Sequence, residues 1–238
     1  MKKRVIAIIL GIVMVITLVA CNLFESGSSG DADSSPVPTG SADSSPTPTP
    51  EATPDPIIPN LPDIDELRTG DLIHFAGIFW QVLALEADRA LIITEDVIER
   101  RAYHVDGGEI TWEFSSIRNY LNNEFLNNFN LADQNRILET NVINSNNPEH
   151  GTLGGNDTED KIFLLSIDEA LTYFVDNSER IALNSNGVTN GWWLRSPSGG
   201  GNIVAGVLGD GRVGLGGYGV SNYYSGGVRP ALWLSIQP

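Results

Sequence analysis

The sequence Gly191-Trp192-Trp193-Leu194-Arg195-Ser196-Pro197 begins the part of the chain that decides its fold. After it, short apolar pieces alternate with glycine, asparagine and tyrosine, and 14 of the 25 glycines lie between residues 187 and 227. Short runs rich in Val, Ile and aromatic residues, separated by turn residues, are typical of β-strands. We expect strands at residues 192–195, 203–208, 212–215 and 228–234.

A hairpin is expected within this half. Asp210-Gly211 lies between the apolar runs 203–208 and 212–215. Asp-Gly between strands is a strong signal for a tight type I′ turn, which needs positive φ at both central positions. The two runs are therefore predicted to pair as antiparallel strands.

The residues before this half predict three further strands. Apolar runs rich in Ile, Val and aromatic residues lie at 71–75, 78–85 and 89–94. Gly77 and the polar stretch 86–88 interrupt these runs, as turns do. We expect a three-stranded meander, with the terminal strand of the chain pairing back near it.

Between the two β-regions the pattern changes to that of helices. Residues 115–125 place apolar side chains on one helical face behind a serine cap. A shorter helix is expected at 131–138. A strand at 161–165 runs into Ser166-Ile167-Asp168-Glu169, a capping box that opens a helix to Phe174. Strands, then helices, then strands indicate an α+β domain.

The first 21 residues are typical of an exported protein. Residues 2–4 are basic and precede an apolar stretch at 5–20, which is shorter than the roughly 20 residues needed to span a bilayer. Such a stretch also fits an uncleaved anchor helix, or an ordinary signal peptide followed by a chance cysteine. Leu18-Val19-Ala20-Cys21 resembles the lipobox of bacterial lipoproteins, whose cysteine is acylated. We expect residues 1–20 to be a lipoprotein signal peptide and Cys21 the lipid attachment point.

Composition divides the rest of the chain in two. Nine of the 13 prolines lie between residues 36 and 62, in a stretch with few large apolar side chains. Such a stretch cannot bury enough surface to offset its ordering entropy. We expect a disordered tether rich in Ser, Pro and Thr at 21–62 and one globular domain at 63–238.

The charge balance limits the partners. The chain has 14 Lys and Arg against 30 Asp and Glu, which gives a net charge of −16. Phosphate binding needs clustered basic residues, so this balance argues against nucleic acid. The single cysteine rules out a disulfide framework and a cysteine-rich zinc module.

Five motifs follow one another along the expected domain. They are Phe79-Trp80-Gln81-Val82-Leu83, Thr111-Trp112-Glu113 with Ser116-Ile117-Arg118-Asn119-Tyr120-Leu121-Asn122, Asp160-Lys161-Ile162-Phe163-Leu164-Leu165-Ser166, the Gly191–Pro197 sequence, and Gly227-Val228-Arg229-Pro230-Ala231-Leu232. Together they resemble a domain-of-unknown-function family, number 6273, found in surface and secreted proteins of bacteria. The family has no established activity, so this resemblance implies no chemistry.

The last two motifs also resemble a second group of proteins. These are C-type-lectin-like domains of the formylglycine-generating and retroelement-diversified type. The resemblance implies that the strand with Arg229 closes the core and that the loops before it form the ligand face. The oxidation chemistry of the formylglycine-generating enzymes uses cysteines, and Cys21 is the only one here. The calcium and sugar motifs of animal lectins are also absent.

Catalytic and metal-binding patterns are weak in this sequence. His74, His104 and His150 have no metal-ligand spacing, and no nucleophile elbow is present. Carboxylates and amides at 96–106 or 156–160 could offer oxygens to Ca²⁺, although neither has an EF-hand register. We assign no catalytic residue, no metal ligand and no cofactor.

The better ligand candidates lie in the C-terminal loops. They are Asn202, Asp210, Arg212, Tyr218, Asn222, Tyr223 and Tyr224. Tyrosine, serine, glycine and asparagine combine rigid aromatic contact with adaptable hydrogen bonding, as in antibody paratopes. A glycine-rich surface loop without a ligand is the alternative. A structural role is expected for Trp192, Trp193, Arg195 and Arg229, with the tryptophans in the core and the arginines anchoring loops.

These observations favour a binding protein in the cell envelope. We expect a lipid-anchored extracytoplasmic protein, attached to the bacterial membrane through Cys21, that recognises a glycan or protein ligand through the loops between Pro197 and Gly227. The alternatives are an envelope enzyme acting on wall or polysaccharide and a passive structural domain. A further hypothesis is that the segment 199–227 is diversified, which a genome without a near-identical template repeat differing at adenines would contradict.

Overall fold

A computed structural model of the chain describes residues 66–222 and 226–237. The chain divides into two units, Met1–Pro54 and Asp55–Pro238, and every described residue belongs to the second. The expected signal peptide, lipidation site and tether lie outside the described residues. So do Tyr223 and Tyr224.

The predicted meander is present. Its strands are β1 (Leu72–Phe75), β2 (Ile78–Leu85) and β3 (Arg89–Thr94). Phe75 pairs with Ile78, which leaves two residues in the first turn. Both have positive φ, 51° at Ala76 and 81° at Gly77, as a type I′ turn requires.

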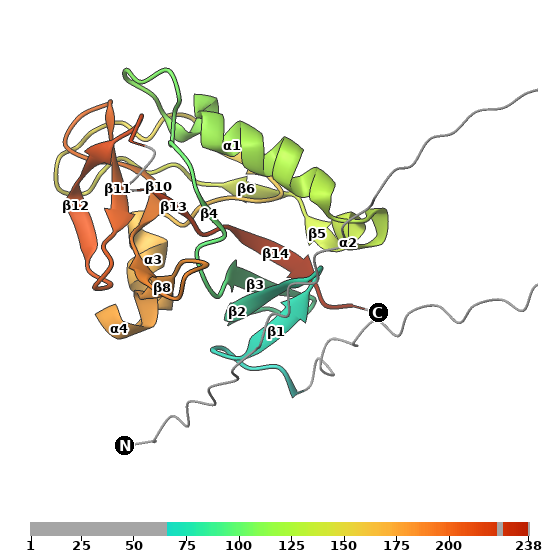
Figure 1. Cartoon of the computed structure of the whole chain (residues 1–238). Coiled ribbons are helices and arrows are strands. Elements are labelled where there is room, and N and C mark those ends of the chain that lie inside the picture. Colours follow the sequence, from blue (N-terminus) through green and yellow to red (C-terminus); the bar gives the residue numbers. More distant parts are fainter. Residues whose placement is uncertain (1–65, 223–225, 238) are drawn as a thin grey trace, which may run out of the picture. The chain divides into compact units, whose positions relative to one another are not determined.

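Two more strands complete the first sheet. β14 (Ala231–Ser235) pairs with β3 and with β5 (Ile137–Leu138), and all pairs in the order β1-β2-β3-β14-β5 are antiparallel. The terminal strand therefore returns to the meander, as the sequence predicts. The single strand expected at 228–234 is wrong, because Arg229 and Pro230 interrupt it and this strand begins only at Ala231. Figure 1 shows β14 beside β3 at the end of the domain away from β11 and β12.

The second sheet contains residues 192–197 of the tryptophan-rich Gly191–Pro197 sequence. Its order is β12-β11-β10-β13-β4. The strands are β12 (Val213–Gly219), β11 (Ile203–Val207), β10 (Trp192–Pro197), β13 (Gly227–Val228) and β4 (Glu99–Arg100). β13 runs parallel to β10 and antiparallel to β4. The chain then passes through Arg229 and Pro230 into β14, so one short segment joins the two sheets.

The hairpin between β11 and β12 is confirmed, but the predicted turn type is wrong. Val207 pairs with Val213, and five residues connect them. Gly211 has a φ of 82°, whereas Asp210 does not have positive φ. The amide of Gly211 donates to the carbonyl of Leu208 at 2.9 Å. Only one residue of the turn needs the left-handed region, so it is a longer loop with a glycine at its end.

The helices are short. They are α1 (Ser116–Tyr120), α2 (Leu131–Arg136), α3 (Ile167–Tyr173) and α4 (Asn177–Arg180). A π-helical turn (Leu121–Phe125) and a 3₁₀ turn (Leu126–Asn128) extend α1, so that Figure 1 shows one long helical segment. A 3₁₀ turn (Trp112–Phe114) precedes it.

The helix caps agree with the sequence. The Oγ of Ser115 accepts a hydrogen bond from the amide of Arg118, and Ser166 and Glu169 form the predicted capping box. The short helix α4 was not predicted. Asp176 caps it by accepting from the amides of Ser178 and Glu179.

One strand and one helix differ from the sequence prediction. The expected strand at 161–165 forms only an isolated bridge between Phe163 and Ala231. Side chains from elsewhere in the chain occupy neighbouring backbone groups: Asn122 accepts from two amides, and Arg195 donates to the carbonyl of Leu164. The helix at 131–138 ends at Arg136, because the next two residues form β5 with β14.

Two further hairpin-like pairs complete the domain. β6 (Thr140–Val142) pairs with β7 (Thr158–Asp160), and β8 (Ala182–Leu183) pairs with β9 (Thr189–Asn190). One hydrophobic cluster extends from Leu67 to Leu234 and contains side chains of both five-stranded sheets. The fold is therefore α+β, with several small sheets and few helices around one core.

Candidate functional site

The predicted ligand residues do not form one surface. Asp210 and Arg212 lie in the turn between β11 and β12, whereas Asn202 precedes β11 and Tyr218 lies near the end of β12. The register pairs Val207 with Val213 at one end and Ile203 with Gly219 at the other. The hairpin therefore separates the candidates into two groups, and Asn222 belongs with Asn202 and Tyr218.

The turn end of the hairpin is held by local contacts. The Nε of Arg212 donates to the Oδ2 of Asp210 at 2.7 Å, and both side chains are exposed. Hydrogen bonds from the amide and side chain of Arg212 lower the pKa of Asp210. The carbonyl of Gly211 accepts a hydrogen bond from the buried guanidinium of Arg180 at 2.9 Å. This end is attached to α4 and presents an internally paired charge.

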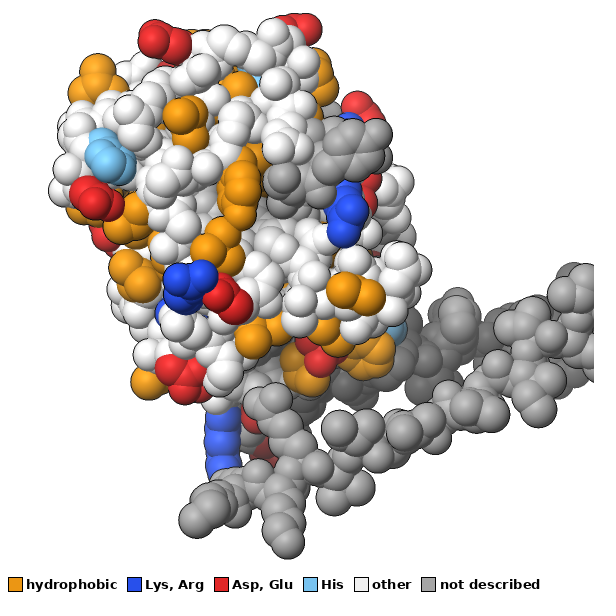
Figure 2. All heavy atoms as spheres, turned by 60° about the vertical axis from the view of Figure 1, so that its left-hand side comes forward, with side chains coloured by type: hydrophobic (Ala, Val, Ile, Leu, Met, Phe, Trp, Pro, Cys, Tyr) orange, Lys and Arg blue, Asp and Glu red, His pale blue; other side chains and the backbone are white. Residues whose placement is uncertain are grey.

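The opposite end of the hairpin combines an aromatic support with exposed polar groups. The ring of Tyr218 packs edge-on against Trp193, with 6.2 Å between ring centroids, and is partly buried. Asn202 is exposed, and its carbonyl accepts from the amide of Val220. On the side of β10–β12, Figure 2 shows mainly uncharged polar side chains and backbone, with charged side chains scattered. Recognition there would depend on hydrogen bonds and aromatic contact.

The residues expected to be structural are deeply buried. Trp192 and Trp193 are both 1% exposed, and their indole N–H groups donate to the carbonyls of Arg180 and Arg101. Arg195 donates to the carbonyls of Leu164 and Ile143 and is paired with the carboxylate of Glu169.

Arg229 is also deeply buried, at 1% exposure. Its guanidinium donates to the carbonyls of Thr94 and Glu95 at 2.9 and 3.0 Å. Burial lowers its pKa to about 10, so it is still charged at neutral pH. Arg229 therefore fastens the segment between β13 and β14 to the end of β3.

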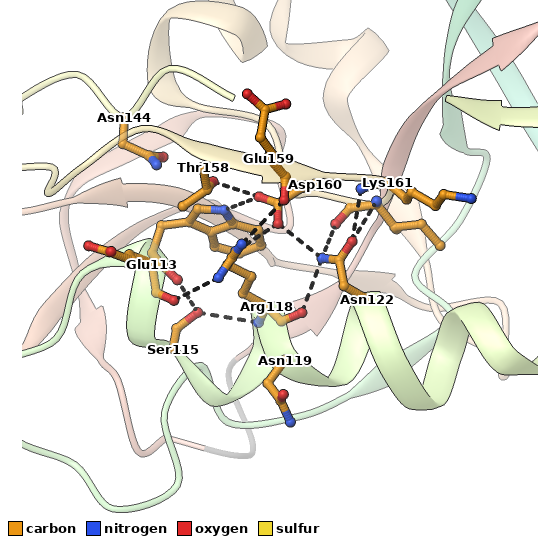
Figure 3. Close-up of polar contacts among 12 residues, drawn as sticks. Glu113, Ser115, Arg118, Asn119, Asn122, Asn144, Thr158, Glu159, Asp160 and Lys161 are labelled. Atoms are coloured by element: carbon orange, nitrogen blue, oxygen red, sulfur yellow. Dashed lines mark hydrogen bonds and ion pairs between the residues drawn. The ribbon is translucent and has the colours of Figure 1, made fainter. Parts of the chain in front are cut away.

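A polar cluster surrounds Asp160, which the sequence indicated only as one of the possible oxygen donors to Ca²⁺ at 156–160. Its side chain is fully buried, and its Oδ2 accepts from the indole of Trp112 at 2.8 Å and from the hydroxyl of Thr158 at 2.7 Å. Its Oδ1 accepts from the Nε of Arg118 at 2.7 Å and from Asn122 at 3.3 Å. Figure 3 shows Arg118 from α1, Asn122 from the π-helical turn and Thr158 from β7 pointing toward the carboxylate.

The Asn122 amide extends this Asp160 cluster to the chain beyond β7. Its oxygen accepts from the amides of Lys161 and Ile162, and its nitrogen donates to the carbonyl of Ile162 at 2.8 Å. Both carboxylate oxygens already have two donors, so the cluster offers no open acceptor to a ligand. It fixes the helical segment to the sheet. Apart from Thr158, its members come from the second and third sequence motifs, a signal that could have revealed it.

The second polar cluster lies at a hollow in the surface. A groove of about 230 Å³ opens beside β4. It is lined by Val97, Ile98, Glu99, Arg100, Asn184, Ser185 and Asn186. We call it the β4 groove. Apart from the carboxylates at 96–106, nothing in the sequence indicated it.

Of the charged side chains around the β4 groove, Glu99 forms an ion pair, whereas Arg100 contacts an uncharged amide. The Oε1 of Glu99 accepts from the Nε of Arg101 at 3.2 Å, and the guanidinium of Arg101 lies 3.6 Å from the ring centroid of Tyr120. Burial and the neighbouring Glu99 raise the pKa of Tyr120 to about 12. Arg100 donates through its Nε to the Oδ1 of Asn190 at 2.9 Å.

The histidines lie apart. His74 is on β1 with its ring edge toward Phe79, His104 contacts the hydroxyl of Ser116, and His150 lies 3.9 Å from Glu149. Within residues 66–222 and 226–237 no group of three or more His, Cys, Asp or Glu side chains could hold a metal ion. None of the helices described is long and apolar enough to cross a membrane.

The fold defines an α+β domain built from two joined five-stranded sheets, with a polar groove at the edge of one of them. A family model described as "Domain of unknown function (DUF6273)" matches residues 87–236. The chain belongs to this family. No curated protein and no solved structure matches the chain.

Proposed function

We propose that this protein is an extracytoplasmic binding protein, anchored in the membrane by a lipid on Cys21, that recognises a glycan or protein ligand through its C-terminal loops. The sole cysteine follows the apolar stretch 5–20 directly, where a lipoprotein would be acylated. Stable anchoring takes more than one acyl chain, which a diacylglyceryl thioether supplies.

The domain is further proposed to be C-type-lectin-like. In such folds the strand that carries the arginine of the last motif closes the core, and the loops before it form the ligand face. Three features support this assignment: β14 lies inside the first sheet, Arg229 is buried beside it, and the loop residues 198–202 and 220–222 precede it.

The observation that carries the binding role is the Tyr218 end of the β11–β12 hairpin. Here a tyrosine ring is supported by the buried Trp193, and exposed Asn202 lies at the start of the same hairpin. Residues on loops that a rigid scaffold positions are disproportionately functional. The opposite end, where Asp210 and Arg212 pair with each other, offers fewer unengaged groups.

An array of glycans and cell-wall fragments tests the binding role. We would apply the chain from Asn22 to Pro238, which keeps the whole second unit. The double variant Asn202→Ala with Tyr218→Phe should lose at least ~10-fold in affinity, about 1.4 kcal/mol. The double variant Asp210→Ala with Arg212→Ala, at the other end of the hairpin, is the matched control and should bind normally.

The outcomes separate the parts of this proposal. Equal loss in both double variants would contradict the location of the site, and no binding to any glycan would contradict the glycan form and leave a protein ligand. For the anchor, Cys21→Ser should abolish metabolic labelling with palmitate and release the chain from the membrane fraction. Labelling that persists in this variant would overturn the lipidation site.

A further inference from the structure

We propose that the β4 groove binds a single sugar unit that bears a carboxylate, with the guanidinium of Arg100 taking the carboxylate. This inference deepens the proposed function and rests on its glycan form. The groove adjoins the C-terminal loops, because β4 pairs with β13, and the amide of Arg101 donates to the carbonyl of Gly226.

The charge of the groove selects an anion. Glu99, the carboxylate in its wall, is paired with Arg101 and lies beside Tyr120. The preceding carboxylates, Glu95 and Asp96, interact with Arg229, where they favour the charged guanidinium. Arg100 is thus the lining charge without an ionic partner among the described residues, although the chain as a whole is strongly acidic.

The arginine is held in place for such a contact. Its Nε is engaged by the Oδ1 of Asn190, which is 5% exposed and donates in turn to the carbonyl of Gly191. The two terminal nitrogens of Arg100 have no partner among the described residues. A guanidinium presents parallel N–H groups that match a carboxylate in bidentate geometry. Fixing one edge of the group through a buried amide lowers the entropy lost on binding.

The remaining walls suit a sugar ring. Asn184, Ser185 and Asn186 contribute amide and hydroxyl groups, which pair with ring hydroxyls as donors and acceptors. The turn that carries them is fixed, because the Oδ1 of Asn184 accepts from the amides of Asn186 and Val188 at 2.9 and 3.2 Å. At about 230 Å³ the groove is smaller than the ~300–1,000 Å³ of pockets for drug-sized ligands. It therefore accommodates one ring of a longer chain.

Two monosaccharide probes test the inference directly. The ¹⁵N-labelled chain from Asn22 to Pro238 would be titrated with methyl glucopyranosiduronate and, separately, with the neutral methyl glucopyranoside. The acidic probe should shift the amide resonances of 97–100 and 184–186 with a Kd on the order of 1 mM, as weak single-site contacts give. The neutral probe should bind at least ~10-fold more weakly, the loss of one charge-assisted contact.

Substitutions then identify the residue. Arg100→Gln should weaken the acidic probe at least ~10-fold, and Arg100→Lys, which keeps the charge and loses the fork, should fall between Arg100→Gln and the unchanged chain. Arg212→Gln, a second exposed arginine at the far turn, is the control and should leave binding unchanged. Equal binding of the two probes, or full binding by Arg100→Gln with an unchanged unfolding midpoint, would overturn the inference.

Failure here is distinguishable from failure of the proposed function. If array binding is lost in the Asn202 and Tyr218 double variant but kept in Arg100→Gln, the loop site stands and the groove assignment falls. If the acidic probe binds the groove while that double variant keeps its array signal, the groove stands and the loop location falls. If no glycan and neither probe binds, the groove assignment and the glycan form of the proposed function both fall.

Discussion

The Asp160 cluster and the β4 groove contain the same kinds of side chain but differ in how many partners these have within the protein. Each contains at least one arginine, one carboxylate and one asparagine. In the Asp160 cluster four donors from the protein meet one buried carboxylate. In the β4 groove, Arg100 uses one edge of its guanidinium on Asn190 and lies at the surface. Residue type alone does not separate scaffold from recognition; the number of internal partners does.

Burial explains the difference in energetic terms. An ionised carboxylate removed from water is very costly unless paired and hydrogen-bonded, and Asp160 is both. An exposed arginine such as Arg100 costs the fold little whether or not a ligand engages it. The two clusters should therefore respond oppositely to substitution, the first through stability and the second through binding.

The largest effect should come from removing the buried carboxylate. Asp160→Ala leaves the Nε of Arg118, the indole of Trp112 and the hydroxyl of Thr158 without this acceptor, and we expect a loss of about 3–5 kcal/mol in the free energy of unfolding. Urea denaturation followed by tryptophan fluorescence measures it. Glu159→Ala, an exposed neighbour, should change stability by less than ~0.5 kcal/mol. A small loss for Asp160→Ala would mean that the cluster is not part of the scaffold.

The amide of the same cluster should come next. Asn122→Ala leaves the amides of Lys161 and Ile162 without an acceptor, so we expect a loss of about 1–3 kcal/mol. Asn123→Ala is the matched control, because this exposed side chain bonds only to Asn119 among the described contacts. Equal losses in the two variants would contradict the role assigned to Asn122. The same denaturation experiment compares them.

Tyr120, which lies beside Glu99 of the β4 groove, should make the free energy of unfolding depend on pH in the alkaline range. The pKa of Tyr120 is about 12 in the fold, against 10 for an ordinary tyrosine. The folded state therefore keeps the proton longer than the unfolded state, and stability falls as pH rises from about 10 to 12. Tyr120→Phe should show a shallower fall in its urea midpoint over this range.

Arg229 acts in the opposite sense. Its lowered pKa makes its burial less costly above pH 10. Arg229 is present in both the unchanged protein and the Tyr120→Phe variant, so the difference between their pH profiles reports on Tyr120. Identical profiles for the unchanged chain and Tyr120→Phe would contradict the contribution of the tyrosine.

The smallest effect on stability belongs to the groove arginine. Arg100→Gln removes one exposed hydrogen bond to Asn190, so the free energy of unfolding should change by less than ~0.5 kcal/mol. Thermal melting at neutral pH measures the change. A loss of several kcal/mol would place Arg100 with the scaffold groups and end the contrast between the two clusters.

Features encoded by neighbouring residues could be predicted from the sequence. The meander follows from alternating apolar runs, and the capping box at Ser166 follows from a four-residue pattern. The type I′ turn was expected at Asp210-Gly211 but lies at Ala76 and Gly77. Alanine is a poor indicator of positive φ, and the longer loop at Asp210 removes that requirement there.

Features that depend on distant residues could not be predicted. The strand expected at 161–165 fails because Asn122 and Arg195 occupy its backbone groups. The β4 groove joins residues 97–100 to 184–186. Two hydrogen bonds hold these segments together: the amide of Leu183 donates to the Oδ1 of Asp96, and the amide of Val97 donates to the carbonyl of Leu183. Neither segment carries a periodic signal that points to the other.

The position of β14 has a consequence for the timing of folding. This strand follows all the others of the domain along the chain and lies between β3 and β5, so the first sheet has a gap until synthesis has reached residue 235. Its partner β3 ends about 140 residues earlier, and pairings so distant in sequence form slowly. While the residues before β14 are being made, the first sheet therefore stays incomplete. We expect the domain to fold only once β14 has been synthesised, in one step that depends on this strand.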